Sequence, residues 1–432
     1  MKRNTLFRLA APLLAFTLVI AACGSDENGG ATSDTTHDSM VDTMVDTTVD
    51  SMVDVASTQT GAATLRAGLT DLLSEHIFLA ALATDSALRG DTAGFEAYAG
   101  ALNGPTNSNT ADLTAAITSA YGAEIGNAFD GLWRSEGHIP AVVAYTQAVA
   151  ANDSAAADKA VADLLAYAKT FGTTMNQVNS NLPAAAVEEG VIMHITTLKA
   201  VIDAQKSGDQ SKVYSSLREA YRHMAGFAEI LAGATVQMFP EVFDGDASSP
   251  ASGLRSGMRL LLREHVLLAA SATDAALGGR QAQFEAAATA LNGLANSNTA
   301  DIVGAITSVY GDEIGKAFDG LWRSEGHIPA FVAYTQAVAK NDNAAADKAI
   351  ADLLAYADTF GATMNSVNAN LPADAVTDAI KMHATTLKAV IDAQKVGDPA
   401  KTAPLLRAAI AHMSATADVL AEATVKLFPE KF

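Results

Sequence analysis

Residues 65–89 read LRAGLTDLLSEHIFLAALATDSALR, and this stretch indicates the fold class. Its apolar residues recur every three or four positions, as they do on one face of an amphipathic helix. That face comprises Leu65, Leu69, Leu72, Leu73, His76, Leu79, Ala80 and Ala83. The pattern predicts a helix that is capped by Thr64 and ends near Gly90, with a histidine on its buried side.

The same alanine- and leucine-rich pattern continues along the chain, interrupted by turn residues at helix-length intervals. We expect further helices over about 93–102, 111–121, 124–151, 153–175 and 183–206, and a last one that ends at Phe239-Pro240. Pro140 should kink or break the helix over 124–151, because proline lacks a backbone donor and clashes with the preceding turn. The adjacent His138 would then project from irregular backbone. These patterns predict an all-α fold.

Residues 65–243 and 254–432 align without a gap and form two tandem copies of one unit. Four histidines of the first copy, His76, His138, His194 and His223, are matched 189 positions later by His265, His327, His383 and His412. Their flanks differ: residues 188–192 read EEGVI and residues 377–381 read TDAIK, yet a Met-His pair follows both. Histidines kept between changed neighbours indicate a constraint on those sites.

The N-terminal region predicts export and lipid anchoring. Lys2 and Arg3 precede an apolar stretch, and residues 20–24 read IAACG, which is typical of a bacterial lipoprotein signal. We therefore expect a signal peptide over 1–22, with Cys23, the only cysteine, lipidated and holding the protein extracytoplasmically on a bacterial cell membrane. Residues 23–63, which include SMVDTMVDTTVDSMVD, would form a disordered acidic tether.

The remaining boundaries follow from the repeat. We expect one helical bundle over 64–243, a linker over 244–253 and a second, homologous bundle over 254–432.

Composition excludes several classes of function. The net charge of −20 without a basic stripe argues against nucleic-acid binding, which depends on clustered lysine and arginine. A single cysteine excludes covalently attached haem, which needs two. The sequence contains neither a Gly-x-Ser-x-Gly elbow nor a phosphate-binding glycine loop. It also lacks the paired Glu-x-x-His motifs of ferritin-type di-iron bundles.

The positions of the histidines within the expected helices predict that they meet. His76, His194 and His223 each fall near the middle of a helix, and mid-length residues of an up-and-down bundle share one layer. His138, beside its break, would complete a four-histidine set. The residues next to these histidines could border the layer and add ligands: Glu75, Met193 and Met224 in the first copy, and Glu264, Met382 and Met413 in the second.

Four neutral imidazoles in a dry layer would carry ring nitrogens that need partners, and a metal ion satisfies them together. Imidazole suits copper, zinc, iron and nickel, whereas the nearby methionine thioethers favour copper(I). We therefore expect copper first and zinc second, with iron as a further option. A cluster of hydrogen-bonded core histidines is the alternative that requires no metal.

Four stretches also resemble a known group of proteins: LWRSEGHIPAVVAYTQAVA (132–150), NLPAAAV (181–187), MHITTLKAVIDAQKSGD (193–209) and FPEVF (239–243). In them the chain resembles an uncharacterised family of extracytoplasmic bacterial helical-repeat lipoproteins, sometimes labelled copper amine oxidase-like. The resemblance implies the repeat fold and the envelope location. It does not imply amine oxidation, because Ala144-Tyr145-Thr146 lacks the Asn-Tyr-Asp/Glu setting in which those enzymes mature a tyrosine.

The sequence thus predicts a membrane-anchored metal-binding protein, with one site per repeat, that stores, buffers or delivers copper. Its partners would be the membrane, through the lipid on Cys23, and the metal ion. One alternative is a structural or interaction lipoprotein whose histidines pack the core. A second is a redox bundle that binds haem or iron. No protein partner is indicated, and an enzymatic role is not expected.

Overall fold

The computed structural model describes residues 57–432, and these fold into α-helices without any β-strand, which confirms the all-α prediction. The predicted signal peptide, Cys23 and the tether up to residue 56 lie outside the described residues. Within residues 57–432, no helix combines the length and the apolar character that a bilayer crossing requires.

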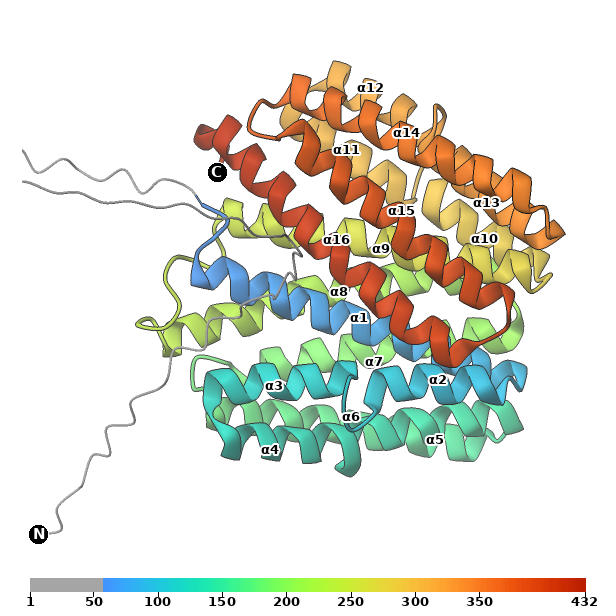
Figure 1. The fold of residues 1–432 in the computed structure, drawn as a ribbon. Coiled ribbons are helices and arrows are strands. Elements are labelled where there is room, and N and C mark those ends of the chain that lie inside the picture. Colours follow the sequence, from blue (N-terminus) through green and yellow to red (C-terminus); the bar gives the residue numbers. More distant parts are fainter. Residues whose placement is uncertain (1–56) are drawn as a thin grey trace, which may run out of the picture. The chain divides into compact units, whose positions relative to one another are not determined.

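Each repeat contributes a matching series of helices (Figure 1). The first repeat contains α1 (Gly61–Arg89), α2 (Thr92–Asn103), α3 (Asn109–Tyr121), α4 (Ala123–Gly131), a π-helical turn (Leu132–Glu136), α5 (His138–Ala151), α6 (Ser154–Val178), α7 (Ala184–Ser207) and α8 (Gln210–Met238). The second contains α9 (Pro250–Leu277), α10 (Gln281–Asn292), α11 (Asn298–Tyr310), α12 (Asp312–Arg323), α13 (His327–Lys340), α14 (Asn343–Val367), α15 (Ala373–Lys395), α16 (Pro399–Leu427) and a closing 3₁₀ turn (Pro429–Lys431).

Local sequence accounts for most helix ends. The side chains of Ser108, Asp153 and Asp209 each accept a hydrogen bond from a backbone N–H three residues further on, which satisfies a donor of the first turn. Gly90 and Gly208 end α1 and α7 with φ angles of 74° and 75°, a left-handed conformation that glycine adopts without strain.

The first helix starts earlier than the sequence predicted. It begins at Gly61, inside the expected tether, and Thr60 rather than Thr64 caps it. Ala62 and Ala63 are fully buried there, and the Gly61 N–H donates to the Asp244 carboxylate at 2.7 Å. The extra turn therefore depends on a tertiary contact with a residue about 180 positions away, which helical periodicity does not reveal.

The expected break at Pro140 is confirmed. Helix α4 ends at Gly131, the π-helical turn follows, and α5 begins at His138, so that Pro140 occupies the first turn of a new helix. Proline is tolerated there because the first N–H groups of a helix have no intrahelical acceptor. The second repeat breaks at the same place, between α12 and α13.

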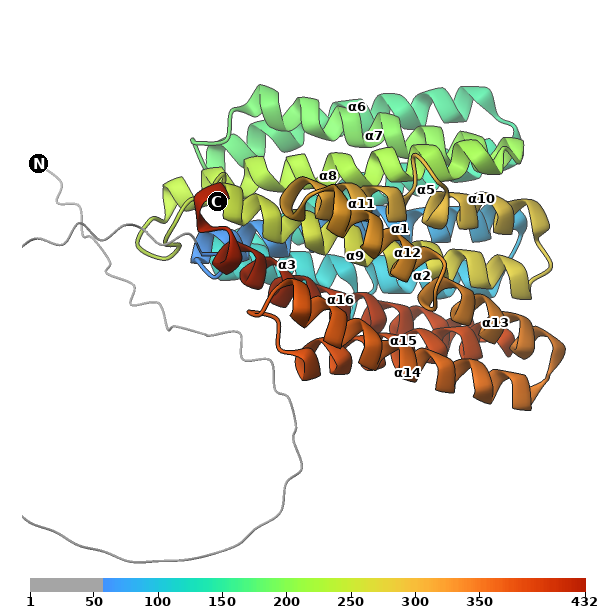
Figure 2. The ribbon, with the colours of Figure 1, turned by 90° about the horizontal axis from the view of Figure 1, so that it is seen from above.

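The two repeats pack against each other. Within the first repeat, α6 packs on α7, α7 on α8 and α8 on α1; in the second, α14, α15, α16 and α9 repeat this arrangement. Across the junction, α1 contacts α9, α2 contacts α16, and α10 contacts α8. In Figure 2, α6–α8 and α14–α16 lie on opposite sides, with α1 and α9 between them. Residues 57–432 therefore form one compact unit.

Reciprocal ion pairs cross this junction. Arg218 of the first repeat donates to Glu264 and Asp301 of the second, and its counterpart Arg407 donates to Glu75 and Asp112 of the first. Such reciprocity is what a twofold, self-complementary interface produces. The repeats thus pair as two subunits of a homodimer would.

Candidate metal centre

Three of the predicted histidines of the first repeat converge in its core. His76 comes from the middle of α1, His138 is the first residue of α5, and His194 lies in the middle of α7. One ring nitrogen from each lies within 4.8 Å of the other two, and all three residues are buried. The Nε2 atoms of His76 and His138 are 3.3 Å apart.

The second repeat builds the same cluster from His265, His327 and His383 on α9, α13 and α15. Its ligand atoms also lie within 4.8 Å of one another, and the Nε2 atoms of His265 and His327 are again 3.3 Å apart. We call the two clusters the first and the second histidine centre. Among residues 57–432 they are the two groups whose spacing could hold a metal ion.

The fourth histidine of each repeat does not join its centre, which corrects the prediction of a four-histidine set. His223 is half-buried on α8, and its Nε2 lies 2.9 Å from the carbonyl oxygen of Gly190 on α7. His412 makes the matching contact with Ala379. The mid-helix position of His223 and His412 was the reason to expect them in the centres. Each ring is instead directed to a backbone carbonyl of the neighbouring helix.

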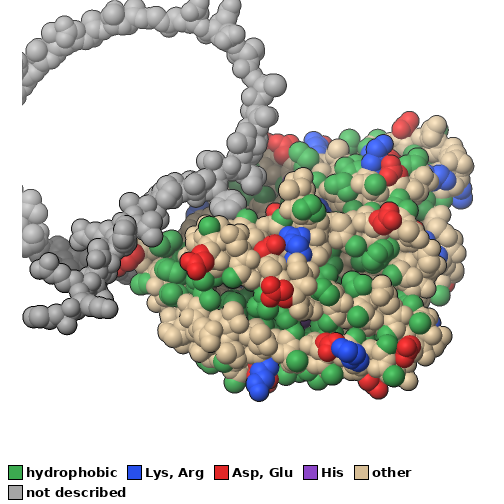
Figure 3. All heavy atoms as spheres, turned by 90° about the horizontal axis from the view of Figure 1, so that it is seen from below, with side chains coloured by type: hydrophobic (Ala, Val, Ile, Leu, Met, Phe, Trp, Pro, Cys, Tyr) green, Lys and Arg blue, Asp and Glu red, His purple; other side chains and the backbone are tan. Residues whose placement is uncertain are grey.

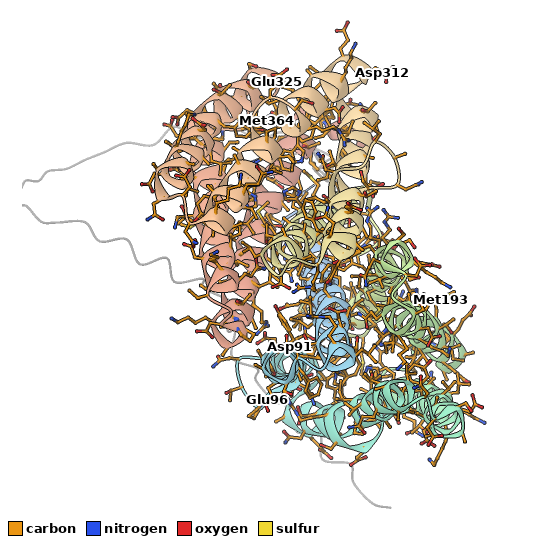
Figure 4. The ribbon with its side chains drawn as sticks, turned by 90° about the vertical axis from the view of Figure 1, so that its right-hand side faces the viewer. Asp91, Glu96, Met193, Asp312, Glu325 and Met364 are labelled. Atoms are coloured by element: carbon orange, nitrogen blue, oxygen red, sulfur yellow. The ribbon has the colours of Figure 1, made fainter. Side chains whose placement is uncertain are left out.

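Met193, Met382 and the two glutamates have their surroundings outside the centres. Met193 and Met382 are 48% and 52% exposed, and Met193 points outward from α7 (Figure 4). Met224 and Met413 are buried in the apolar core. Glu75 and Glu264 are buried too, but they are paired with arginines of the other repeat. Adjacent residues of a helix differ by about 100° in direction, so residues next to a core histidine commonly face another partner.

Aromatic residues surround the first centre. The Trp133 ring, from the π-helical turn, lies 4.6 Å from the His138 ring and 5.1 Å from the His76 ring, measured between centroids. Tyr167 of α6 stacks on His138 at 5.4 Å. Helical periodicity does not distinguish either residue from the rest of the core. Both recur as Trp322 and Tyr356, but so many positions recur that this alone could not identify them.

The centre concentrates buried polar atoms without hydrogen-bond partners. Both ring nitrogens of His194 and the Nδ1 atoms of His76 and His138 are unpaired. Trp133 Nε1 and Tyr167 Oη are unpaired as well, and the second repeat reproduces the full set. Leaving such a group unpaired costs about 1–3 kcal/mol, so a cluster of them in each repeat needs a compensating partner.

Burial keeps these histidines neutral. Desolvation lowers the pKa of His76 to about 4, against a smaller raising effect of the Asn109 side chain, and lowers the pKa of His194 to about 3. The pKa of His138 lies well below its usual range because of burial and the two neighbouring imidazoles. Since a metal binds the neutral imidazole rather than the imidazolium, these histidines would not have to lose a proton before binding metal at neutral pH.

The second centre is neutral for the same reason. Desolvation lowers the pKa of His265 to about 4 and takes the pKa values of His327 and His383 well below their usual range.

The spacing suits coordination of one ion. Two imidazole nitrogens at 2.0–2.1 Å from a tetrahedral metal are about 3.3–3.4 Å apart, which matches the Nε2 separation of His76 and His138. The His194 ligand atom lies within 4.8 Å of both. Two axial ligands of a haem would instead be about 4 Å apart on opposite faces, so the observed pair does not fit that role.

Comparison of the chain with protein-family models, with curated proteins and with solved structures finds no match.

Proposed function

We propose that each repeat binds one copper or zinc ion through its three buried histidines, and that the protein stores, buffers or delivers this metal. The observation that carries the proposal is His194, a buried imidazole that has neither ring nitrogen paired and lies beside two other neutral imidazoles. One cation would satisfy ligand nitrogens from three helices at once.

The choice between copper and zinc rests mainly on the imidazoles. The exposed Met193 and Met382 cannot act as thioether ligands from their present positions, so these two methionines do not favour copper(I). Three neutral nitrogens suit zinc and both oxidation states of copper, and iron remains less favoured because the centre contains no carboxylate ligand.

A structural role for the histidines is the second candidate. It is favoured by the close packing of Trp133 and Tyr167 on the His138 ring, which would stabilise the core without any ion. The two candidates differ in whether metal stabilises the folded chain, because only a ligand that binds the native state raises its melting temperature.

The location is part of the proposal. The signal-like residues 1–22 and Cys23 support export and lipid anchoring on a bacterial cell membrane, where the histidine centres would face extracytoplasmic metal. Mass spectrometry of the protein purified from its membrane would show a lipidated N-terminal Cys23. An unmodified chain that retains residues 1–22 would contradict this.

Metal loading tests the binding itself. The mature chain is loaded with copper(I), copper(II) or zinc, desalted, and assayed for metal content and melting temperature. We expect two ions per chain, one ion for His194→Leu, and two ions for the control His223→Gln. Leucine suits position 194 because the histidine makes no hydrogen bond that would be lost. A chain that stays metal-free with all three ions would overturn the proposal.

A further inference from the structure

A cavity of about 410 Å³ adjoins the first histidine centre. It lies between α1, α2, α5 and α7, and the side chains of His76 and His138 form part of its wall. Most of the remaining wall is apolar and includes Phe95, Leu102 and Leu198. A space of this size is within the range of small-molecule sites, which are mostly apolar with a few convergent polar groups.

The cavity offers a ligand few polar partners except the histidine centre. Its lining contains no lysine, arginine, aspartate or glutamate. Its two threonines are already engaged, because Thr84 donates to Gln205 and Thr146 donates to the backbone of Val142. Two other polar side chains line it: Asn103, whose Oδ1 accepts from Arg134, and the exposed Gln147. On the side of the molecule that carries α4 and α5, charged side chains are scattered among many hydrophobic ones (Figure 3). The wall would therefore hold a ligand through contacts with the ligand's apolar body, and the metal would hold it through one coordinating atom of the ligand.

The second repeat has a corresponding cavity of about 390 Å³, but its relation to the histidines differs. Only His265 of the second centre lines it. Phe331 stands at the position of Val142, and its ring lies 5.4 Å from the His327 ring and 5.6 Å from the His383 ring, measured between centroids. Phe331 is buried and also lines the cavity, so its ring stands beside His327 and His383 where the first repeat has the smaller valine.

We propose that the first centre, unlike the second, accepts an exogenous ligand on its metal: a small molecule with one nitrogen or oxygen donor and a compact apolar body, seated in the cavity beside His76 and His138. This rests on the proposed metal binding. Three histidines leave a fourth position of a tetrahedral ion free, which is the feature that separates reactive zinc sites from closed structural ones. The second centre, with Phe331 packed beside its histidines, holds its ion without an added ligand.

Two full-length variants isolate the centres. His383→Leu retains the first centre and His194→Leu retains the second. Each is loaded with cobalt(II), a spectroscopic substitute for zinc, and its metal content is measured before any ligand is added. One ion per chain is expected in both. Absence of cobalt, zinc and copper from both variants after separate loading would refute the metal binding, and with it this inference, before the cavity is probed.

The probe is 4-phenylimidazole, with imidazole as the comparison that lacks the apolar body. Binding is followed by the visible absorption of cobalt. We expect 4-phenylimidazole to bind the first centre at least ten times more tightly than the second, and more tightly than imidazole does. Equal affinity at the two centres in metal-loaded protein would overturn the inference while leaving metal binding intact.

Exchanging the residues at one position gives matched variants. In the His383→Leu chain, Val142→Phe should weaken 4-phenylimidazole binding to the first centre at least tenfold. In the His194→Leu chain, Phe331→Val should strengthen binding to the second centre by a similar factor. Each chain should still hold one cobalt ion. The second variant gains a property, so a folding defect cannot imitate it. Unchanged affinities in both variants would refute the role of this position.

Discussion

At the scale of single residues, the centres are defined by imidazoles that burial keeps uncharged. The three histidines of each centre come from separate helices, and their pKa values are lowered chiefly by desolvation. A neutral imidazole is both the form that a metal binds and the form that a dry core tolerates. The same property that prepares the site for metal therefore makes the metal-free protein sensitive to acid.

The unfolding free energy of the metal-free protein should fall as the pH is lowered from 7 to 5. The unfolded histidines take up protons as the pH passes their usual value of 6.5, whereas folded His76 resists protonation until about pH 4 and His194 until about pH 3. Protons thus bind preferentially to the unfolded chain over this range. Once the pH is low enough to protonate His76 in the folded chain as well, the loss of unfolding free energy from this residue alone would be about 3 kcal/mol.

Urea unfolding of metal-free protein at successive pH values measures this dependence. His194→Leu is the control: with one titrating group fewer, its unfolding free energy should change less steeply with pH. An identical slope in the two proteins would show that His194 is not held neutral by the fold.

At the scale of elements, the break between α4 and α5 places His138 in the first centre. The chain turns through Gly137, whose backbone lies against the ring of Tyr167. A methyl group at Gly137 would come within 2.5 Å of the ring carbon Cδ2. Tyr167 in turn stacks on His138, so a displaced Tyr167 ring would disturb the imidazole.

Gly137→Ala should therefore destabilise the protein by about 1–3 kcal/mol, the usual cost of overpacking, and weaken metal binding to the first centre. Gly131→Ala is the matched control, because a methyl group there meets nothing closer than 3.5 Å and the residue is helical. Melting temperatures and competitive metal titrations of both variants test this. Equal metal affinity of Gly137→Ala and Gly131→Ala would show that the turn at Gly137 does not affect metal binding at the first centre.

At the scale of the whole molecule, the repeats form one unit through ion pairs that flank the centres. Glu264 directly precedes His265 and is paired with Arg218, which is 4% exposed. Glu75 precedes His76 and is paired with Arg407 and Arg263. Arg263 has no counterpart in the first repeat, where Ser74 stands, so the junction favours the pairing of unlike repeats.

Glu264→Ala should cost roughly 3–5 kcal/mol, because it deprives the buried Arg218 of its main partner. The surface control Glu136→Ala should change stability by no more than about 0.5 kcal/mol. Urea unfolding followed by tryptophan fluorescence reports both, since Trp133 and Trp322 lie in the two repeats. Similar losses in the two variants would mean that the ion pair contributes little to the folded state.

Sequence alone determined the helical class, the two copies and the break at Pro140, because helical periodicity, gapless repetition and the missing proline donor are local properties. It also singled out His76 and His194 by their mid-helix positions and His138 by the break beside it. It could not exclude His223 or Met193, since the direction of a side chain depends on which neighbouring helix it meets. Only the tertiary structure decided that Trp133 and Tyr167 lie against the histidines, that Phe331 packs beside His327 and His383, and that the repeats share one junction, because these contacts join residues from separate helices.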